Sequence, residues 1–328
     1  MSDYAMTVPA PGGPEAFEKR GIAAPSPGPG EALIRHTAIG LNYLDTYHRS
    51  GLYPWPVEKD LVPGSDGAGV VEAVGEGVTL VKPGDRVAYT FPLNAYSTRR
   101  CVPAERLVPI PQGVSDADAA SLMIKGLTAH YLIHSTYPVK SGDHVLVQAG
   151  AGGVGLLLGQ WLATKAGVTA IATAGGAEKC ALAKAAGYDH VIDYASEDFV
   201  ARVAEITGGA LCEAVYDSVG KTTWEGSVAC LKPRGVFVTF GQASGPIEGF
   251  SLATLTGGGG SLFATRPTLF HYIATREELE WRARDMFELV AAGKLKANVR
   301  QEFALSDVAE AHRALQGRKT VGATVLIP

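Results

Sequence analysis

The sequence predicts an α/β protein with two domains, one mostly β and the other a doubly wound parallel sheet covered by helices. Between about residue 140 and residue 265, strand-like and helix-like segments alternate, which is typical of a parallel sheet. The first third of the chain instead carries short β-like runs broken by Gly and Pro, which favours antiparallel strands. At 328 residues the chain is long enough to form two hydrophobic cores.

The β-like runs of the first domain cover residues 31–39, 69–74, 86–89 and 106–110. A helix is expected from Ser115 to His134. Ser115 is its candidate N-cap, because a serine hydroxyl accepts hydrogen bonds from the unpaired N–H groups of a first helical turn. We expect this helix to lead out of the first domain.

The alternating region is expected to contain strands at residues 144–149, 168–173, 190–193, 213–217, 235–240 and 261–265. A helix from Arg276 to Ala292 follows, and Gly293 ends it. The closing segment predicts a strand at 298–303, a helix at 306–316 and a strand at 322–327, the last of which rejoins the sheet of the first domain. The expected domains are therefore residues 1–125 with 267–328, and residues 126–266.

The most informative motif is Gly150-Ala151-Gly152-Gly153-Val154-Gly155, which lies between the apolar run 144–149 and a helix-like run. G-x-G-x-x-G alone is a weak signal in a chain with 40 glycines, but the order strand, turn, helix favours a dinucleotide site. The glycines allow a tight turn, approach of the backbone to a pyrophosphate, and close contact between helix and strand. The helix N-terminus then offers its free N–H groups to the phosphates.

The end of the second strand of this domain favours NADPH over NADH. An NAD site usually has an Asp or Glu about 20 residues beyond the glycines, bonded to the ribose 2′-hydroxyl. Here the strand runs into Ala174-Gly175-Gly176-Ala177-Glu178-Lys179, with no carboxylate at the strand end. We expect Glu178 to cap the next helix or to face solvent. The open glycines and the Lys179 ammonium suit a 2′-phosphate.

Composition argues against several other classes of function. A net charge of −4 leaves no basic footprint for nucleic acid or an anionic membrane. The four cysteines lie far apart without a C-x-x-C pair, so we expect neither a structural zinc cluster nor a disulfide framework. Without a signal sequence or an apolar run of about 20 residues, the sequence predicts a cytoplasmic protein that does not enter the membrane.

Several motifs occur in one order along the chain: GLNYLDTYHRSGLYP at 40–54, PGSDGAGVV at 63–71, KGLTA at 125–129, the glycine turn, and VYDSVG at 215–220. Together they resemble the NADPH:quinone oxidoreductases related to zeta-crystallin, in the medium-chain dehydrogenase/reductase superfamily. The resemblance implies a GroES-like catalytic domain, a Rossmann NADPH-binding domain, and hydride transfer to a quinone in the cleft between them. It also implies a homodimer in which the edge strands of two Rossmann sheets meet, with residues 245–256 as a candidate contact.

The resemblance further implies a site without a metal. Zinc alcohol dehydrogenases of the superfamily have a Cys where Asn42 stands and a His-Glu pair where Ser65-Asp66 stands, so both zinc positions are lost. It gives Asn42 the role of an orienting amide near the nicotinamide. Lys125 is a candidate donor, or instead a partner of Asp45 or Asp66.

Two tyrosines of the matched segment, Tyr47 and Tyr53, are candidates for positioning the acceptor or donating a proton. Each is equally consistent with a half-buried core aromatic residue.

The positions matched to cofactor contacts fall into three groups. The pyrophosphate group is Gly152, Gly153, Val154 and Gly155, and the adenosine group is Gly175, Lys179, Tyr194 and Arg318. The resemblance directs Arg318 at the 2′-phosphate, and the alternative is that it is a surface arginine. The nicotinamide and strand-end group is Asn42, Thr128, Ser218, Phe240, Gly241, Gln242, Phe263 and Thr265. The family commonly has Asn where Gln242 stands, and Thr128 is alternatively a local cap at a helix start.

Three hypotheses of function remain open. Without zinc, oxidation of an alcohol loses its Lewis acid, whereas reduction of a conjugated acceptor is less demanding. The first hypothesis is therefore NADPH-dependent reduction of quinones. The second is reduction of the double bond of an enal, enone or acryloyl thioester with NADPH. The third, from another class, is an NADPH-binding structural or RNA-binding module, which the acidic net charge disfavours.

Overall fold

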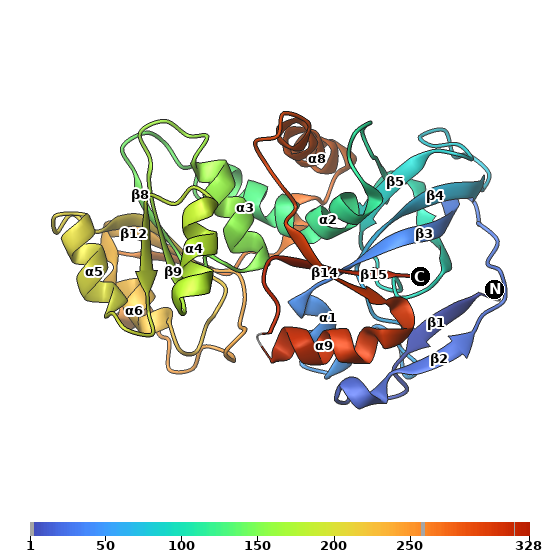
Figure 1. Ribbon diagram of the computed structural model, residues 1–328, viewed down its shortest axis with the longest axis horizontal. Helices are drawn as coiled ribbons and strands as arrows, with labels where there is room; N and C mark the ends of the chain where they lie inside the picture. The colour runs from blue at the N-terminus through green and yellow to red at the C-terminus, as the bar shows by residue number, and fades with distance from the viewer. Residues whose placement is uncertain (1–2, 257–259, 318) are drawn as a thin grey trace. The chain divides into compact units, whose positions relative to one another are not determined.

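The computed structural model describes residues 3–256, 260–317 and 319–328, and the chain divides into two units (Figure 1). The first unit holds the chain up to Lys125 with Thr275–Ala291 and the residues from Ala297 onward, and the second holds Gly126–Ala274 and Ala292–Lys296. Residues 267–274 and 292–296, expected in the first domain, thus belong to the second unit.

Side chains of the second unit explain this difference from the expected boundaries. The ring of Tyr272 stacks on that of Tyr131 with 4.4 Å between centroids, and its hydroxyl accepts a hydrogen bond from the Thr136 hydroxyl at 3.0 Å. The backbone N–H of Lys296 donates to Gln160 Oε1 at 2.8 Å.

The second unit is built on a six-stranded parallel sheet in the order β10-β9-β8-β11-β12-β13. In chain order this is 3-2-1-4-5-6, the order of a dinucleotide-binding doubly wound sheet, and the winding reverses between β8 and β11. The structure therefore confirms the predicted fold class. The strands are β8 (His144–Val147), β9 (Thr169–Ala174), β10 (His190–Asp193), β11 (Cys212–Asp217), β12 (Leu231–Thr239) and β13 (Phe263–Thr265).

Helices cover both faces of this sheet. Helices α3 (Gly153–Leu162) and α4 (Ala177–Ala185) lie on one side, and α5 (Phe199–Ile206) and α6 (Trp224–Ala229) lie on the other (Figure 1). Strand β12 begins at Leu231 and not at Gly235 as predicted, because Leu231 already pairs with Cys212 before a bulge in the ladder. The shorter elements of the unit are the 3-10 turn η4 (Leu252–Thr256) and α7 (Leu269–Tyr272).

The first unit is built on a seven-stranded, mainly antiparallel sheet in the order β14-β15-β3-β4-β5-β7, with β6 paired to β3. As predicted, the last strand of the chain rejoins this sheet, since β15 pairs with β3 and places Thr324 opposite Leu41. The strands are β3 (Glu31–Leu41), β4 (Asp66–Val74), β5 (Arg86–Thr90), β6 (Arg99–Pro103), β7 (Val108–Pro109), β14 (Val299–Ala304) and β15 (Ala323–Ile327).

Parts of the first unit differ from the prediction. The strand expected at 106–110 is wrong over most of its length: Ala104–Arg106 forms the 3-10 turn η2, and only β7 pairs with β5. The Ile110 N–H still donates to the Arg86 carbonyl oxygen at 3.0 Å, and Pro111 then has no N–H to continue the ladder. Four further elements were not predicted: β6, the two-stranded sheet of β1 (Tyr4–Thr7) and β2 (Glu18–Gly21), and the helix α1 (Tyr43–Arg49). The short 3-10 turn η1 (Pro14–Ala16) precedes β2.

The longer helices were predicted well. Helix α2 (Asp116–Tyr131) continues into the π-helical turn η3 (Leu132–Thr136), and the Ser115 hydroxyl accepts from the Asp118 N–H at 3.0 Å, as an N-cap does. Helix α8 (Arg276–Ala291) is followed by Gly293 at a φ of 68°. Helix α9 (Val308–Gln316) follows the 3-10 turn η5 (Leu305–Asp307) and so starts later than predicted. No helix of the described ranges is long and apolar enough to cross a membrane.

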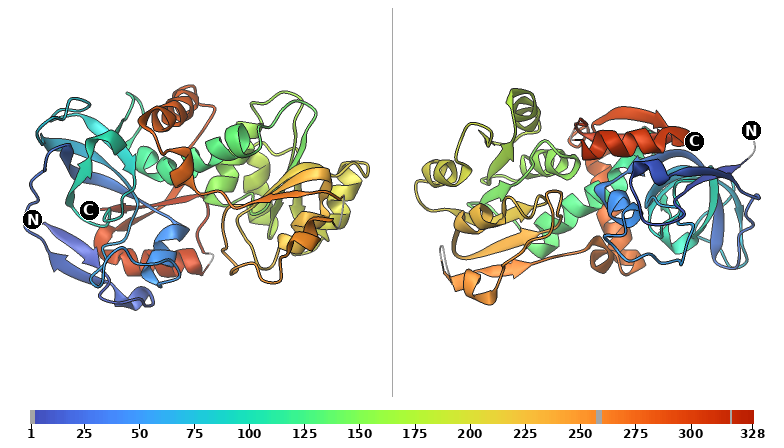
Figure 2. Two further views of the ribbon diagram at one scale, coloured as in Figure 1. Left: turned by 180° about the vertical axis from the view of Figure 1, so that it is seen from behind. Right: turned by 90° about the horizontal axis from the view of Figure 1, so that it is seen from below.

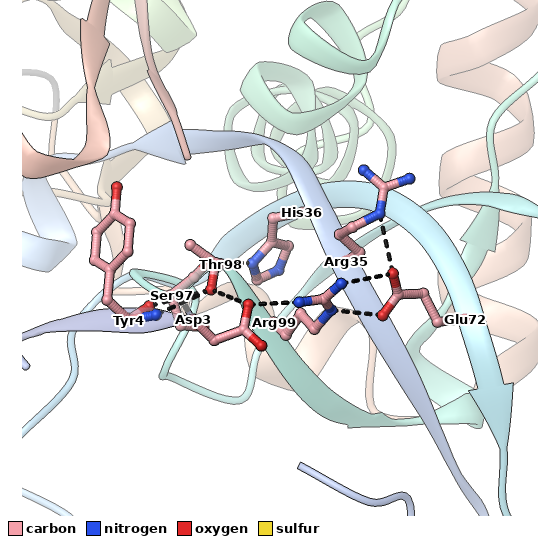
Figure 3. A network of polar contacts seen from close by, with 8 residues as sticks. All are labelled: Asp3, Tyr4, Arg35, His36, Glu72, Ser97, Thr98 and Arg99. Carbon is pink, nitrogen blue, oxygen red and sulfur yellow. Dashed lines mark hydrogen bonds and ion pairs between the residues drawn. The ribbon is translucent and has the colours of Figure 1, made fainter. Parts of the chain in front are cut away.

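An ion-pair network ties the N-terminal segment to the sheet of the first unit (Figure 3). Arg99 donates to Asp3 Oδ1 and to Glu72 Oε2, both at 2.6 Å, and Arg35 Nε donates to Glu72 Oε1 at 3.0 Å. The side chains are partly exposed, so each pair contributes at most about 1 kcal/mol. The network therefore fastens β1 mainly through several weak contacts acting together.

A buried histidine makes the stability of the first unit depend on pH. His36 Nδ1 donates to the Ser97 carbonyl oxygen and His36 Nε2 accepts from the Tyr89 hydroxyl, both at 2.7 Å. Burial lowers the pKa of His36 to about 4 from its usual 6.5. Because the unfolded chain takes up this proton first, the contribution of His36 to stability is lost as the pH falls from 6.5 to about 4.

We therefore expect wild-type protein to lose roughly 1.4 kcal/mol per pH unit relative to a His36→Gln variant across this window. The measurement is urea denaturation of both proteins at several pH values. The matched control is His190→Gln, at an exposed histidine, which should run parallel to wild type. Parallel curves for wild type and His36→Gln would contradict the assignment.

Candidate active site

The glycine turn joins β8 to α3 and brings backbone segments close together. Helix α3 begins at Gly153, and Gly152 is its N-cap residue. A Cβ on Gly155 would lie 2.3 Å from the Ala149 carbonyl oxygen, and one on Gly150 would lie 2.5 Å from Ala172 Cβ. These glycines thus let helix and strands approach, and the first N–H groups of α3 have no acceptor inside the helix.

The next turn, between β9 and α4, brings together residues of the expected adenosine group. A Cβ on Gly175 would lie 2.5 Å from the Tyr194 hydroxyl, so the tyrosine ring lies directly over this glycine. Tyr194 is 51% exposed, which leaves part of the ring open to a ligand. Lys179 lies in α4 and is half-buried, and Glu178 before it is exposed, as predicted. Arg318 lies outside the described residues.

Asp193, at the end of β10, is a residue that the sequence analysis missed. It pairs with Ala174 across the sheet, and its Oδ1 accepts from the Gly176 N–H at 2.9 Å and the Ala195 N–H at 3.0 Å. These backbone hydrogen bonds lower the pKa of Asp193. The carboxylate therefore holds the glycine turn in place. A signal was available, since Asp at a strand end often accepts from the N–H two residues later.

Other matched positions follow the carboxyl ends of neighbouring strands. Ser218 follows β11, Phe240-Gly241-Gln242 follows β12, and Thr265 ends β13. A Cβ on Gly241 would lie 2.6 Å from the Ser218 carbonyl oxygen, so the two strand ends are close neighbours. This is the edge at which open α/β sheets bind ligands.

Three positions of this group have surroundings that the sequence did not show. Gln242 Oε1 accepts from Arg266 Nη2 at 3.1 Å. Phe263 stands at the start of β13 and is 61% exposed. Thr128 is buried in the interior of α2, so the alternative that it caps a helix start is wrong.

In the first unit, Asn42 is the centre of a buried polar cluster. It precedes α1 as the N-cap residue and is 5% exposed. Its Oδ1 accepts from Lys125 Nζ at 2.7 Å, and its Nδ2 donates to Asp66 Oδ2 at 2.9 Å. Because an ammonium only donates and a carboxylate only accepts, the amide is held in one of its two orientations.

Lys125 and Asp66 are buried on either side of this amide. Lys125 also donates to the Leu41 carbonyl oxygen at 3.0 Å, and Asp66 Oδ2 also accepts from the Ile124 N–H at 3.1 Å. Burial raises the pKa of Asp66 to about 6, although the charge of Lys125 opposes this shift. Burial lowers the pKa of Lys125, and Asp66 and Asp45 oppose that shift. The described contacts of the Lys125 ammonium are with Asn42 and Leu41, and Asn42 bridges it to Asp66.

Tyr47 and Tyr53 lie together at α1. Their ring centroids are 5.3 Å apart, and the Tyr53 N–H donates to the Tyr47 carbonyl oxygen at 3.2 Å. Both rings are partly buried. The helix that places them begins with a capping box, in which the Asp45 carboxylate accepts from the Asn42 N–H. The spacing of Asn42 and Asp45 in the sequence is the signal that could have predicted this helix.

The two units together define a class of protein. Residues 28–139 match the family model described as alcohol dehydrogenase GroES-like domain, and residues 153–285 match the one described as zinc-binding dehydrogenase. A GroES-like domain followed by a doubly wound dinucleotide-binding domain is the organisation of the medium-chain dehydrogenase/reductase superfamily.

Similar proteins narrow this class. The chain is 48% identical to a quinone oxidoreductase of Pseudomonas aeruginosa and 44% identical to a 2-haloacrylate reductase of a Burkholderia species, with at least 96% of each chain covered. Its fold matches the crystal structure of Escherichia coli quinone oxidoreductase complexed with NADPH, with a TM-score of 0.96, 42% identity, and 99% and 100% of the two chains covered. The chain belongs to the quinone oxidoreductase family.

Although one matched family model is named for zinc, the residues at Asn42 do not fit this metal. A zinc site needs several deprotonated Cys, His or carboxylate ligands in one shell. Within the described part of the chain, no group of three or more His, Cys, Asp or Glu side chains is placed to hold a metal ion. The Lys125 ammonium donates to Asn42 Oδ1, which puts a positive charge where a cation would have to bind.

Proposed function

We propose that this protein reduces quinones with NADPH and without a metal ion. The observation that carries the proposal is the Asn42 amide, fixed by Lys125 and Asp66 in a chain 48% identical to a quinone oxidoreductase. Bound NADPH supplies a hydride from C4 of its nicotinamide. The proposal includes the preference for NADPH over NADH and the enzyme class EC 1.6.5.-.

The cofactor is held mainly by residues of the second unit. Gly152, Gly153, Val154 and Gly155 bind the pyrophosphate through backbone N–H groups. Gly175, Tyr194, Lys179 and Arg318 bind the adenosine end, where the two cations meet the 2′-phosphate. The nicotinamide end is bound by Thr128, Ser218, Phe240, Gly241, Gln242, Phe263 and Thr265.

The residues of the first unit act on the acceptor. After its contacts with Lys125 and Asp66, the Asn42 amide keeps one N–H and one lone pair for the nicotinamide. Lys125 uses two of its three N–H donors on Leu41 and Asn42, and its charge stabilises negative charge that develops on the acceptor oxygen. Tyr47 and Tyr53 position the acceptor, and their hydroxyls are the candidate proton donors.

A second candidate function is reduction of an activated carbon–carbon double bond. The observation that favours it is the 2-haloacrylate reductase relative, because that reaction also needs a hydride donor and a site that stabilises charge on a conjugated oxygen. The binding-module hypothesis has less support, since the net charge of −4 gives no footprint for RNA.

Steady-state NADPH oxidation with a panel of quinones and a panel of enones and acrylates tests the proposal. We expect kcat/KM for 1,4-benzoquinone to exceed that for methyl vinyl ketone and for 2-chloroacrylate. A higher value for the enone or the acrylate would move the assignment to double-bond reduction. Inactivity with every acceptor would favour a binding role.

We further propose that the protein is a cytoplasmic homodimer. Strand β13 ends the sheet of the second unit and carries the exposed Phe263. Leu252, within residues 245–256, is also exposed, and the Leu262 N–H just before β13 donates to the Leu255 carbonyl oxygen at 2.9 Å. An exposed edge strand with apolar side chains is suited to pair with a second copy. Sedimentation velocity of the purified protein distinguishes the dimer from a monomer.

A further inference from the structure

A chain of buried polar side chains connects α9 to α1, and none of them has a part in the proposed hydride transfer. Arg49 Nη1 lies 2.9 Å from His312 Nδ1, His312 Nε2 lies 3.0 Å from the Tyr96 hydroxyl, and that hydroxyl lies 2.9 Å from Asp45 Oδ2. All four residues are at most 2% exposed. Buried polar groups in such a network are costly unless each has its partners, so their arrangement constrains the structure strongly.

One arrangement of protons satisfies this chain when the Asp45 carboxyl is ionised. A guanidinium can only donate, so His312 Nδ1 accepts from Arg49 and the proton of the neutral ring is on Nε2. His312 Nε2–H then donates to the Tyr96 oxygen, and the Tyr96 hydroxyl donates to Asp45. Burial lowers the pKa of His312 to about 3, which keeps the ring neutral. We call Arg49, His312 and Tyr96 the donor relay, because every hydrogen bond in it points toward Asp45.

The far end of the donor relay is firmly fixed. Arg49 Nε donates to the Gly12 carbonyl oxygen and Arg49 Nη2 donates to Gln316 Oε1, both at 3.0 Å. Gln316 and His312 are both on α9, which lies beside α1 (Figures 1 and 2). One guanidinium thus joins the two helices and orients the imidazole.

The near end of the donor relay reaches the Asn42 cluster. Asp45 Oδ2 also accepts from the Asn42 backbone N–H at 2.9 Å, and Asp45 Oδ1 accepts from the Ser65 hydroxyl at 3.4 Å. Asn42 carries the amide of the proposed active site, and Ser65 precedes Asp66, which binds that amide. Asp45 therefore bonds to the Asn42 backbone on one side of the Asn42–Asp66 hydrogen bond and to the Ser65 hydroxyl on the other.

We propose that Arg49, His312 and Tyr96 are positioning residues of the active site, which hold Asp45 in place and through it fix the Asn42 amide. The kinetic test of this proposal rests on the proposed function, because it measures quinone reduction. The hydrogen bonds of the donor relay do not depend on that function. The His312 imidazole lies on α9. Arg49 fixes the orientation of this ring, and the ring in turn orients the Tyr96 hydroxyl. This gives a positioning role to the buried His312, whose ring contacts Arg49 and Tyr96.

The kinetic test removes the two relay hydrogen bonds of one side chain at a time, at nearly constant side-chain volume. We expect Tyr96→Phe and His312→Leu to lower kcat for quinone reduction about 10- to 100-fold, the usual range for groups that orient active-site ligands. KM for NADPH should stay near the wild-type value, because the proposed pyrophosphate residues are in the second unit, as are Gly175, Tyr194 and Lys179. His312→Gln keeps an acceptor for Arg49 and a donor for Tyr96, so it should restore most of kcat.

The matched control is Tyr89→Phe. Tyr89 is as buried as Tyr96 and its hydroxyl is bonded to a histidine, His36, outside the donor relay. The Tyr89→Phe protein should be less stable than wild type but should keep the wild-type kcat. A folded Tyr96→Phe protein with wild-type kcat, or an equal loss of kcat in Tyr89→Phe, would overturn the proposal.

A second measurement is independent of activity and of any variant. ¹⁵N NMR of the histidine rings in wild-type protein at neutral pH should show His312 neutral, with its proton on Nε2 and a bare Nδ1. The opposite tautomer or an imidazolium would overturn the donor relay. If the protein reduces no quinone, the proposed function fails while this spectrum still decides the direction of the donor relay.

Discussion

Replacing Lys125 with Met is expected to lower kcat for quinone reduction about 100-fold, the scale of losing one donor that stabilises charge in a transition state. The Kd of NADPH should change little, because the pyrophosphate and adenosine residues are untouched. Met is similar in length and apolar, so it removes the ammonium without opening a large cavity. Asn42 Oδ1 and the Leu41 carbonyl oxygen then lose their donor.

Loss of Lys125 also acts on Asp66. Burial already raises the pKa of Asp66 to about 6, and Lys125 is the charge that lowers it. Without this cation the pKa of Asp66 rises further, which favours the protonated carboxyl. Asp66 then no longer selects one orientation of the Asn42 amide.

The measurements are stopped-flow kinetics with 1,4-benzoquinone and a fluorescence titration with NADPH. Lys140→Met, at an exposed lysine, is the control and should behave as wild type. A wild-type kcat in Lys125→Met would show that the amide and the charge have no part in the reaction.

Replacing Lys179 with Ala is expected to reduce kcat/KM for NADPH about 10- to 100-fold and to leave that for NADH nearly unchanged. This is the range for a hydrogen bond to a charged group, about 1.5–3 kcal/mol. The turn at Gly175 and Gly176 has no side chain of its own to contact a ribose, and Oδ1 of the neighbouring Asp193 is bonded to backbone N–H groups. In the proposed site, binding of the 2′-phosphate of NADPH therefore depends on the positive charges of Lys179 and Arg318.

The matched control is Lys184→Ala on the same helix, since Lys184 bonds to the Asp189 carbonyl oxygen. The Lys184→Ala substitution should change kcat/KM for neither NADPH nor NADH. Equal losses with NADPH and NADH in Lys179→Ala would refute the phosphate role.

The alternation of strands and helices made the second unit predictable, and its strand order follows from the fold class. In the first unit, α1 was hidden because it has only seven residues and shows no periodic apolar face. Strand β6 was hidden because its two arginines make it polar.

The residues of the candidate site could be chosen from the sequence, but the contacts that surround them could not. Gly175 and Tyr194 were chosen separately and the structure brings them into contact, as it does Asn42 and Lys125. The donor relay was beyond sequence reasoning, since Arg49 and His312 are 263 residues apart. A lone histidine in a sequence does not show which buried arginine will fix its tautomer.

The most direct test of metal-free quinone reduction by NADPH combines kinetics with metal analysis of one sample. Purified protein is dialysed against a chelator, its zinc content is measured by mass spectrometry, and NADPH oxidation by 1,4-benzoquinone is followed. We predict full turnover with far less than one zinc per chain, and no increase when zinc is added back. Activity that falls with the zinc content and returns with added zinc would contradict the account.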